Sequence, residues 1–177
     1  MSDLFVGVMS GTSRDGIDSV LMELDDGSCA LRRATTTAFP GDISQALDEL
    51  VRSQRAALRE LGAIHTRFGE FAADCVLALL RDAEVRADEI AAIGFSGHTI
   101  FHQPVPPLAF TMQLGNPNVL AARTGITTVA DIYDALTTDR PYRDRFSREK
   151  AFEILNEMKG KIDPDIVDLF IEIQRNR

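Results

Sequence analysis

A glycine-rich stretch near the beginning of the chain carries residue types that bind phosphate. Gly11 and Gly16 have no Cβ, so the backbone between them can come close to a ligand. Backbone N–H groups in a hairpin of this kind can point at phosphate oxygens. The stretch also contains hydroxyl, cationic and acidic side chains, namely Thr12, Ser13, Arg14, Asp15 and Asp18. Asp15 or Asp18 could hold Mg²⁺, directly or through water.

The same composition is also typical of an ordinary polar turn. Glycine, serine, threonine and aspartate are the residues that turns between strands use in any case. Composition alone therefore leaves two interpretations of residues 11–18 open. One is a phosphate-binding loop, and the other is a plain β-hairpin turn without a ligand.

The three histidines of the chain do not favour a metal site. His98 and His102 have the i, i+4 spacing that binds a metal ion on a helix. The residues between them favour an extended chain instead, which separates the two positions by about 13 Å. His65 lies in a helical pattern and is predicted to be a partly buried or surface residue. We therefore predict no metal site among the histidines.

Composition narrows the class of protein. The chain has 177 residues, enough for one core or for one domain with an appendage. Lys and Arg total 19 against 27 Asp and Glu, a net charge of −8, which argues against binding to nucleic acid or to an anionic membrane. Cys29 and Cys75 are lone thiols, both expected to be buried rather than reactive, and they indicate a reducing compartment. With no apolar run long enough for a leader or a membrane span, we predict a cytoplasmic protein.

Hydrophobic periodicity over residues 1–130 predicts alternating strands and helices. Short apolar runs bounded by turn residues predict strands at 4–9, 17–24, 28–38, 91–95, 99–101, 110–114 and 126–129. Apolar residues at spacings of three and four predict helix over 43–82, with a kink at Gly62, and a short helix over 118–123 that ends at Gly125. The expected fold class is therefore α/β, a mixed sheet flanked by helices.

The pattern changes to helix alone after residue 130. Asp131 is predicted to cap a helix, and further apolar stripes follow over 148–159 and 166–173. This shift predicts two parts, residues 1–130 and a helical appendage over residues 131–177. A switch from strand to helix is expected at Ala130 or Asp131.

The order of residues in the first part resembles one enzyme family. Residues 9–18 read MSGTSRDGID, residues 94–102 read GFSGHTIFH and residues 113–117 read QLGNP. Together with residues 121–130, these segments resemble the anhydro-N-acetylmuramic acid kinases, which are peptidoglycan-recycling enzymes of the actin-like ATPase superfamily. In that family the middle segment usually reads Gly-x-His-Gly-Gln-Thr, so Ser96 and His98 depart from the pattern.

The resemblance implies a sugar-kinase half-domain that uses ATP and Mg²⁺. Residues 11–18 would contact the nucleotide phosphates and the metal. The sugar, an anhydro amino sugar, would lie near Ser96, Gly97, His98 and Thr99. The reaction of the family opens the 1,6-anhydro ring with water while O6 is phosphorylated, and it needs a base for that water.

Residues 129–143 resemble a different family. They read VADIYDALTTDRPYR, which is similar to the last part of HD-GYP-type phosphodiesterases, enzymes that cleave cyclic di-GMP at a site with two or three metal ions. In that family the Asp matching Asp131 is a metal ligand, and its partners are upstream histidines and a His-Asp pair. None of the three histidines here is followed by Asp, so Asp131 has no matching partners.

Three hypotheses for the function follow. The first is an anhydro-N-acetylmuramic acid kinase that is truncated and inactive alone, because the catalytic Asp and Gly-rich stretch that follow Ala-Asp in the family are absent after Asp131. The second is a fragment of an HD-GYP-type phosphodiesterase. The third is a non-catalytic chimeric module, for example a homodimer in which a second copy covers the missing half.

Overall fold

The computed structural model describes residues 3–25, 28–103, 105, 107 and 110–130. Asp131, the predicted helical segment 131–177 and the predicted switch from strand to helix at its start lie outside these residues. Within the described ranges the chain forms six strands and three α-helices, with one short 3₁₀ helix, Ala87–Glu89, before the fourth strand.

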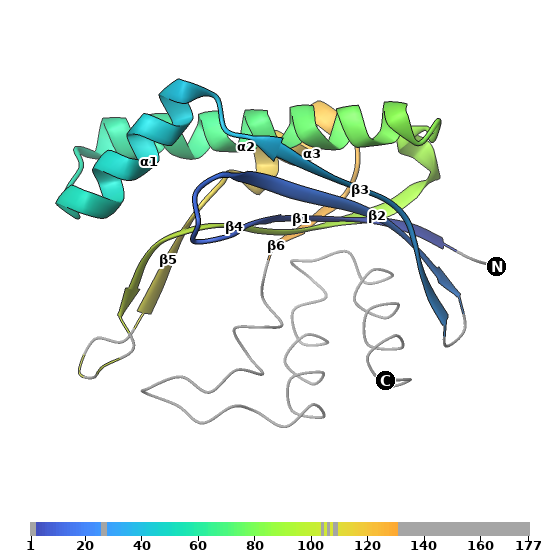
Figure 1. The fold of residues 1–177 in the computed structure, drawn as a ribbon, viewed down its shortest axis with the longest axis horizontal. Coiled ribbons are helices and arrows are strands. Elements are labelled where there is room, and N and C mark those ends of the chain that lie inside the picture. Colours follow the sequence, from blue (N-terminus) through green and yellow to red (C-terminus); the bar gives the residue numbers. More distant parts are fainter. Residues whose placement is uncertain (1–2, 26–27, 104, 106, 108–109, 131–177) are drawn as a thin grey trace.

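The strands form one mixed sheet (Figure 1). Their bounds are β1 Asp3–Ser10, β2 Gly16–Asp25, β3 Ser28–Ala38, β4 Ile90–Gln103, β5 Phe110–Leu114 and β6 Thr128–Ala130. The strand order is β3-β2-β1-β4-β5, and β6 also pairs with β4. β1, β4 and β6 are parallel to one another, whereas β2, β3 and β5 are each antiparallel to their neighbours. The strands predicted at 4–9, 17–24, 28–38 and 110–114 are confirmed.

The α-helices lie together along one face of this sheet (Figure 1). Their bounds are α1 Gly41–Ser53, α2 Leu58–Asp82 and α3 Pro117–Thr124. α3 begins with the side chain of Asn116 accepting hydrogen bonds from two backbone N–H groups, and it ends at Gly125 in a left-handed conformation, as predicted. The predicted α/β class, with a mixed sheet flanked by helices, is confirmed.

The core lies between the sheet and α2. Alternate residues of the central strands point toward the helices, which buries Val6 and Val8 of β1 and Ile93 and Phe95 of β4. α2 contributes the apolar stripe that the sequence indicated, with Ile64, Phe68, Cys75 and Leu79 all buried. This packing holds α2 across one face of the sheet.

The region predicted to be helical over 43–82 forms two helices, and the predicted kink at Gly62 is wrong. The interruption lies at residues 54–57, between α1 and α2, and not at Gly62, which is inside α2. Gln54 takes a left-handed conformation (φ 52°), and its N–H donates to Leu50 O, which closes the last turn of α1. No glycine marks this end, so it could not be predicted from a local signal.

The predicted break between strands at Ser96 and Gly97 is also wrong. β4 continues through both residues to Gln103. Its first half pairs with β1 and β6, and its second half pairs with β5, so both halves are held by neighbouring strands. Gly97 adopts a positive φ of 69° within β4, next to register shifts in the pairing. His98 and His102 therefore lie on a strand, as the sequence predicted.

Two other expectations concern individual residues. Cys75 is buried as expected, but Cys29 is exposed, because β3 is an edge strand of the sheet. His65 accepts a hydrogen bond from the Gly115 N–H at its Nδ1 (3.2 Å), so its side chain ties α2 to the segment before α3. Among the described helices, none has the length and apolar character needed to cross a membrane.

Candidate functional site

The loop between β1 and β2, residues 11–15, is the first candidate site and is called the hairpin loop below. The Arg14 N–H donates to Gly11 O (3.3 Å), which closes a turn with Thr12 and Ser13 at its tip. Arg14 then adopts a left-handed conformation (φ 60°). A turn followed by a left-handed residue brings successive backbone N–H groups to one side, an arrangement that binds anions. Such a conformation is uncommon for arginine, and it was not indicated by the sequence.

Asp15 lies inside this arrangement. Its carboxylate accepts a hydrogen bond from the Ser13 hydroxyl (Oγ–Oδ1 2.7 Å) and further hydrogen bonds from the backbone N–H groups of Asp15 and Gly16. These hydrogen bonds, that of Ser13 first, lower the pKa of the Asp15 carboxyl because they stabilise its charged form. The hairpin loop therefore presents an ionised carboxylate beside its N–H groups.

Gly16 follows the loop where β2 meets β3. A Cβ at this position would lie 2.3 Å from Thr37 O and 2.9 Å from Thr37 C, both backbone atoms of β3. No side chain larger than hydrogen fits there without moving the pairing of the two strands. The sequence suggested Gly16 as a place where the backbone approaches a ligand, whereas the structure shows the backbone of β3 next to it.

Asp18 is the second predicted carboxylate. It lies on β2 between the buried residues Ile17 and Ser19, so its side chain is on the face of the sheet opposite the helices. The hydroxyl of Thr36 donates to it (Oγ1–Oδ1 2.6 Å). A carboxylate can accept about four hydrogen bonds, so Asp15 and Asp18 both retain capacity for water molecules bound to a metal ion. Among the described residues, no group of three or more His, Cys, Asp or Glu side chains is placed to hold a metal ion directly.

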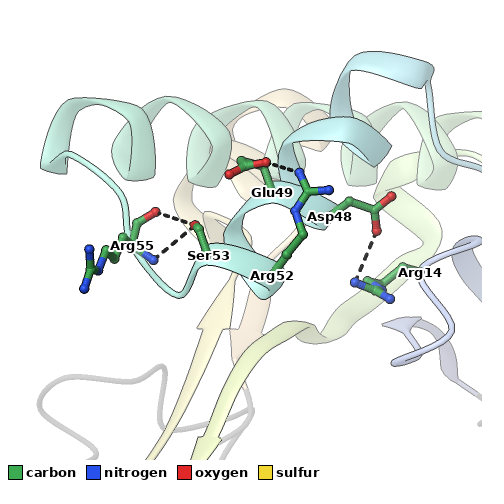
Figure 2. A network of polar contacts seen from close by, with 6 residues as sticks. All are labelled: Arg14, Asp48, Glu49, Arg52, Ser53 and Arg55. Atoms are coloured by element: carbon green, nitrogen blue, oxygen red, sulfur yellow. Dashed lines mark hydrogen bonds and ion pairs between the residues drawn. The ribbon is translucent and has the colours of Figure 1, made fainter.

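Arg14 connects the hairpin loop to α1. Figure 2 shows its guanidinium directed toward the carboxylate of Asp48 on α1, with an N–O distance of 3.2 Å. Glu49 and Arg52 form a neighbouring ion pair along the same helix. Because Asp48 is more than half exposed, this pair contributes little to stability and can be exchanged for another anion.

The second predicted cluster, Ser96, Gly97, His98 and Thr99, lies on β4. Ser96 and Thr99 are half-buried, whereas Gly97 is buried and His98 is fully buried. Thr99 donates through its hydroxyl to the side-chain oxygen of Gln113 on β5 (3.0 Å). His98 is paired with Ser10 in the register of β4 with β1, and its Nδ1 lies 3.0 Å from Ser10 Oγ. The two clusters predicted from the sequence are therefore brought together through Ser10.

Ser10 is a residue that the sequence reasoning missed. Its hydroxyl donates to Gly16 O (2.9 Å), so it links the two ends of the hairpin loop to each other and to His98. It lies directly before Gly11, at the end of an apolar strand. This position was the one signal in the sequence that could have identified it as part of the site. The hairpin loop follows the carboxyl end of β1. Because β1 and β4 are parallel, their carboxyl ends lie at the same edge of the sheet, and ligands bind at this edge in many α/β sheets.

Acid conditions are expected to destabilise the folded chain through His98. Burial lowers the pKa of the His98 imidazole below its ordinary value of 6.5, and the positive charge of Arg14 lowers it further. Just below pH 6.5 the unfolded chain binds more protons at this position than the folded chain. The free energy of unfolding therefore falls as the pH falls below 6.5, and the stabilisation is fully present above it.

Urea unfolding followed by far-UV circular dichroism at about pH 7.5 and about pH 5.5 tests this expectation. The His98→Asn variant is the control, because asparagine is polar but does not titrate. The loss of stability on acidification should be smaller in the variant than in the wild type. An equal loss in both proteins would show that His98 does not titrate differently in the folded and unfolded states.

Comparison with known proteins shows which family the sequence belongs to. The family model described as anhydro-N-acetylmuramic acid kinase matches residues 3–135. The chain belongs to the anhydro-N-acetylmuramic acid kinase family. This match includes the hairpin loop and the cluster on β4, and it confirms the resemblance seen in the sequence of the first part. The mixed sheet flanked by helices is consistent with a sugar-kinase half-domain of the actin-like ATPase type.

Individual relatives show the same likeness. The anhydro-N-acetylmuramic acid kinase of Vibrio cholerae is 44% identical over 129 residues, which cover 73% of this chain and 35% of the relative. The kinases of the same name from Photobacterium profundum and Sulfurovum sp. are 43% and 40% identical over 127 residues, or 72% of this chain. The chain spans about a third of the length of the curated relatives it matches. The HD-GYP-type segment predicted after residue 130, with Asp131 as a match to a metal ligand, stays a prediction.

Proposed function

We propose that this chain binds Mg²⁺-ATP at the hairpin loop and acts in the ATP-dependent phosphorylation of an anhydro amino sugar. The observation that carries the proposal is the turn closed by Arg14 and Gly11, with Arg14 left-handed, at the carboxyl end of β1. This backbone suits an anion such as a nucleotide phosphate. Membership of the anhydro-N-acetylmuramic acid kinase family supports the choice of ATP and sugar over other anionic ligands.

Different residues of the hairpin loop are proposed to contact the phosphates and the metal ion. The exposed hydroxyl of Thr12 and the backbone N–H groups at the tip of the turn donate to phosphate oxygens. Ser13 donates its one hydroxyl hydrogen to Asp15 and so holds that carboxylate in the loop. Arg14 is part of the loop, and its guanidinium would exchange Asp48 for a phosphate. Asp15 and Asp18 would hold Mg²⁺ through its bound water molecules, and the ion would supply positive charge beside the phosphates.

The sugar is placed near the cluster on β4. Ser96 and Thr99 are half-buried, so their hydroxyls are the proposed sugar contacts. Gly97 and His98 are buried, and in this proposal they shape the strand next to the hairpin loop. Turnover needs a base for the water that attacks the anhydro ring, whereas nucleotide binding does not. Nucleotide binding and turnover are therefore measured separately.

Isothermal titration of the full chain with Mg²⁺-ATP tests nucleotide binding. The Thr12→Ala variant removes a hydroxyl proposed to donate to a charged phosphate, so its affinity should fall about tenfold. Ser53→Ala is the matched control, because this hydroxyl is at the end of α1 and its hydrogen bonds are to Arg55. The control should bind within about twofold of the wild type.

No heat of binding in the wild type, or equal affinity in Thr12→Ala and Ser53→Ala, would contradict the proposed nucleotide site. Turnover is followed separately as release of ADP with anhydro-N-acetylmuramic acid as substrate. The native mass measured with and without Mg²⁺-ATP tests the alternative of a non-catalytic homodimer in the same samples.

A further inference from the structure

His98 is fully buried and lies among aromatic rings. Its ring is 5.9 Å from that of Phe68 on α2 and 6.1 Å from that of Phe39, centroid to centroid. One ring nitrogen, Nδ1, lies 3.0 Å from Ser10 Oγ at the end of β1. The other, Nε2, is buried and has no hydrogen-bond partner among the described residues.

The hydrogen bonds of Ser10 determine which nitrogen carries the proton. A serine hydroxyl has one hydrogen to donate and can accept from other groups. Ser10 donates its hydrogen to Gly16 O at 2.9 Å, so toward His98 it can only accept. Nδ1 must then be the protonated nitrogen, and Nε2 is left with a lone pair. A bare lone pair facing apolar rings costs less than a charged imidazolium there.

These contacts connect a buried side chain to both ends of the hairpin loop. The N–H of His98 holds Ser10, which precedes the loop, and Ser10 holds the carbonyl of Gly16, which follows it. Without the donor at Nδ1, the Ser10 hydroxyl is free to rotate away from Gly16. The loop would then be closed at its base only by backbone pairing.

We propose that His98 is a positioning residue, which in its neutral Nδ1–H form fixes the hairpin loop through Ser10 without touching the ligand. The inference adds to the proposed function, because the loop it fixes is the proposed phosphate site.

Three variants at this position separate the role of Nδ1 from that of packing. His98→Asn keeps an amide donor near Nδ1, and His98→Gln moves the amide toward Nε2. His98→Leu keeps an apolar side chain of similar volume without any donor. Amide hydrogen exchange of residues 11–16 reports loop order without any ligand. It should be about tenfold faster in the Leu and Gln variants than in the wild type, and nearly unchanged in the Asn variant.

A spectroscopic measurement tests the same inference in the wild type. Nitrogen-15 shifts of the His98 ring at about pH 7.5 should show a protonated Nδ1 and an unprotonated Nε2. The opposite tautomer, or equal loop exchange in the Leu and Asn variants, would overturn the inference. Global unfolding in urea is measured alongside, so that a loop effect larger than any change in stability identifies positioning rather than loss of fold.

Mg²⁺-ATP affinity then separates this inference from the proposed function. If the wild type binds nucleotide, the Leu and Gln variants should bind about tenfold more weakly than the Asn variant. If loop exchange and tautomer are as expected and the wild type does not bind nucleotide, the proposed function is wrong and the role of His98 in the loop is upheld.

Discussion

Replacing Gly97 by alanine is expected to lower the free energy of unfolding by about 4 kcal/mol. Two separate costs contribute to this value. The residue has a φ of 69°, where an L-residue with a Cβ is strained. The added Cβ would also lie 2.4 Å from Leu114 O, a backbone atom of the paired strand β5. Because Leu114 O belongs to the backbone and not to the end of a flexible side chain, β4 and β5 would have to separate.

Gly94→Ala is the matched control, since Gly94 is on the same strand. Its added Cβ would meet only Val6 O, at an ordinary distance of 4.0 Å, and its φ is not in the left-handed range. The control should change the free energy of unfolding by less than about 1 kcal/mol. Urea unfolding of both variants, followed by circular dichroism, provides the comparison. Similar small effects in the two variants would show that Gly97 is not left-handed in the protein.

Replacing Phe68 by alanine is expected to cost about 4 kcal/mol, since it leaves a cavity under α2. Phe68 is fully buried, and its ring lies 5.6 Å from that of Phe39 and 6.4 Å from that of Phe95. It also packs against His98, so the cavity would open next to the residue that holds Ser10. We therefore expect faster amide exchange in the hairpin loop as well as lower stability.

A second aromatic residue is the control for this substitution. Phe110 on β5 is 47% exposed and stacks on Phe101, so Phe110→Ala should cost only about 1 kcal/mol. If Phe68→Ala does not fold, Phe68→Leu retains most of the side-chain volume and should cost about 1.5 kcal/mol. Equal losses for Phe68→Ala and Phe110→Ala would contradict the position of Phe68 in the core.

Local patterns in the sequence determined most of the elements of the first part. β3 and β5 begin and end where the alternation of residues and the turn signals predicted, and α3 ends at Gly125 as expected. The apolar stripe of α2 identified the side of that helix which faces the core. These features depend on residues within a few positions of one another, so a single sequence contains the information for them.

The order of residues 9–18 also located the hairpin loop and suggested its ligand. What the sequence missed is how the loop is held. The contact between Ser10 and His98 joins residues 88 positions apart, and Arg14 meets Asp48 on a helix. Such contacts arise only when parallel strands pair and a helix packs over them. The left-handed backbone of Arg14 has no signal in its residue type, because the turn and not the side chain imposes it.

Two elements were decided by tertiary structure against the local pattern. Ser96 and Gly97 read as the end of a strand, yet β4 continues because β1 and β6 pair with its first half and β5 with its second. Residues 43–82 are helical as predicted, yet they divide at residues 54–57 into α1 and α2 instead of bending at Gly62. In both cases the sequence indicated which residues are buried in the core and which face the solvent. The neighbours available for hydrogen bonding and packing, which are distant in sequence, decided where each element ends.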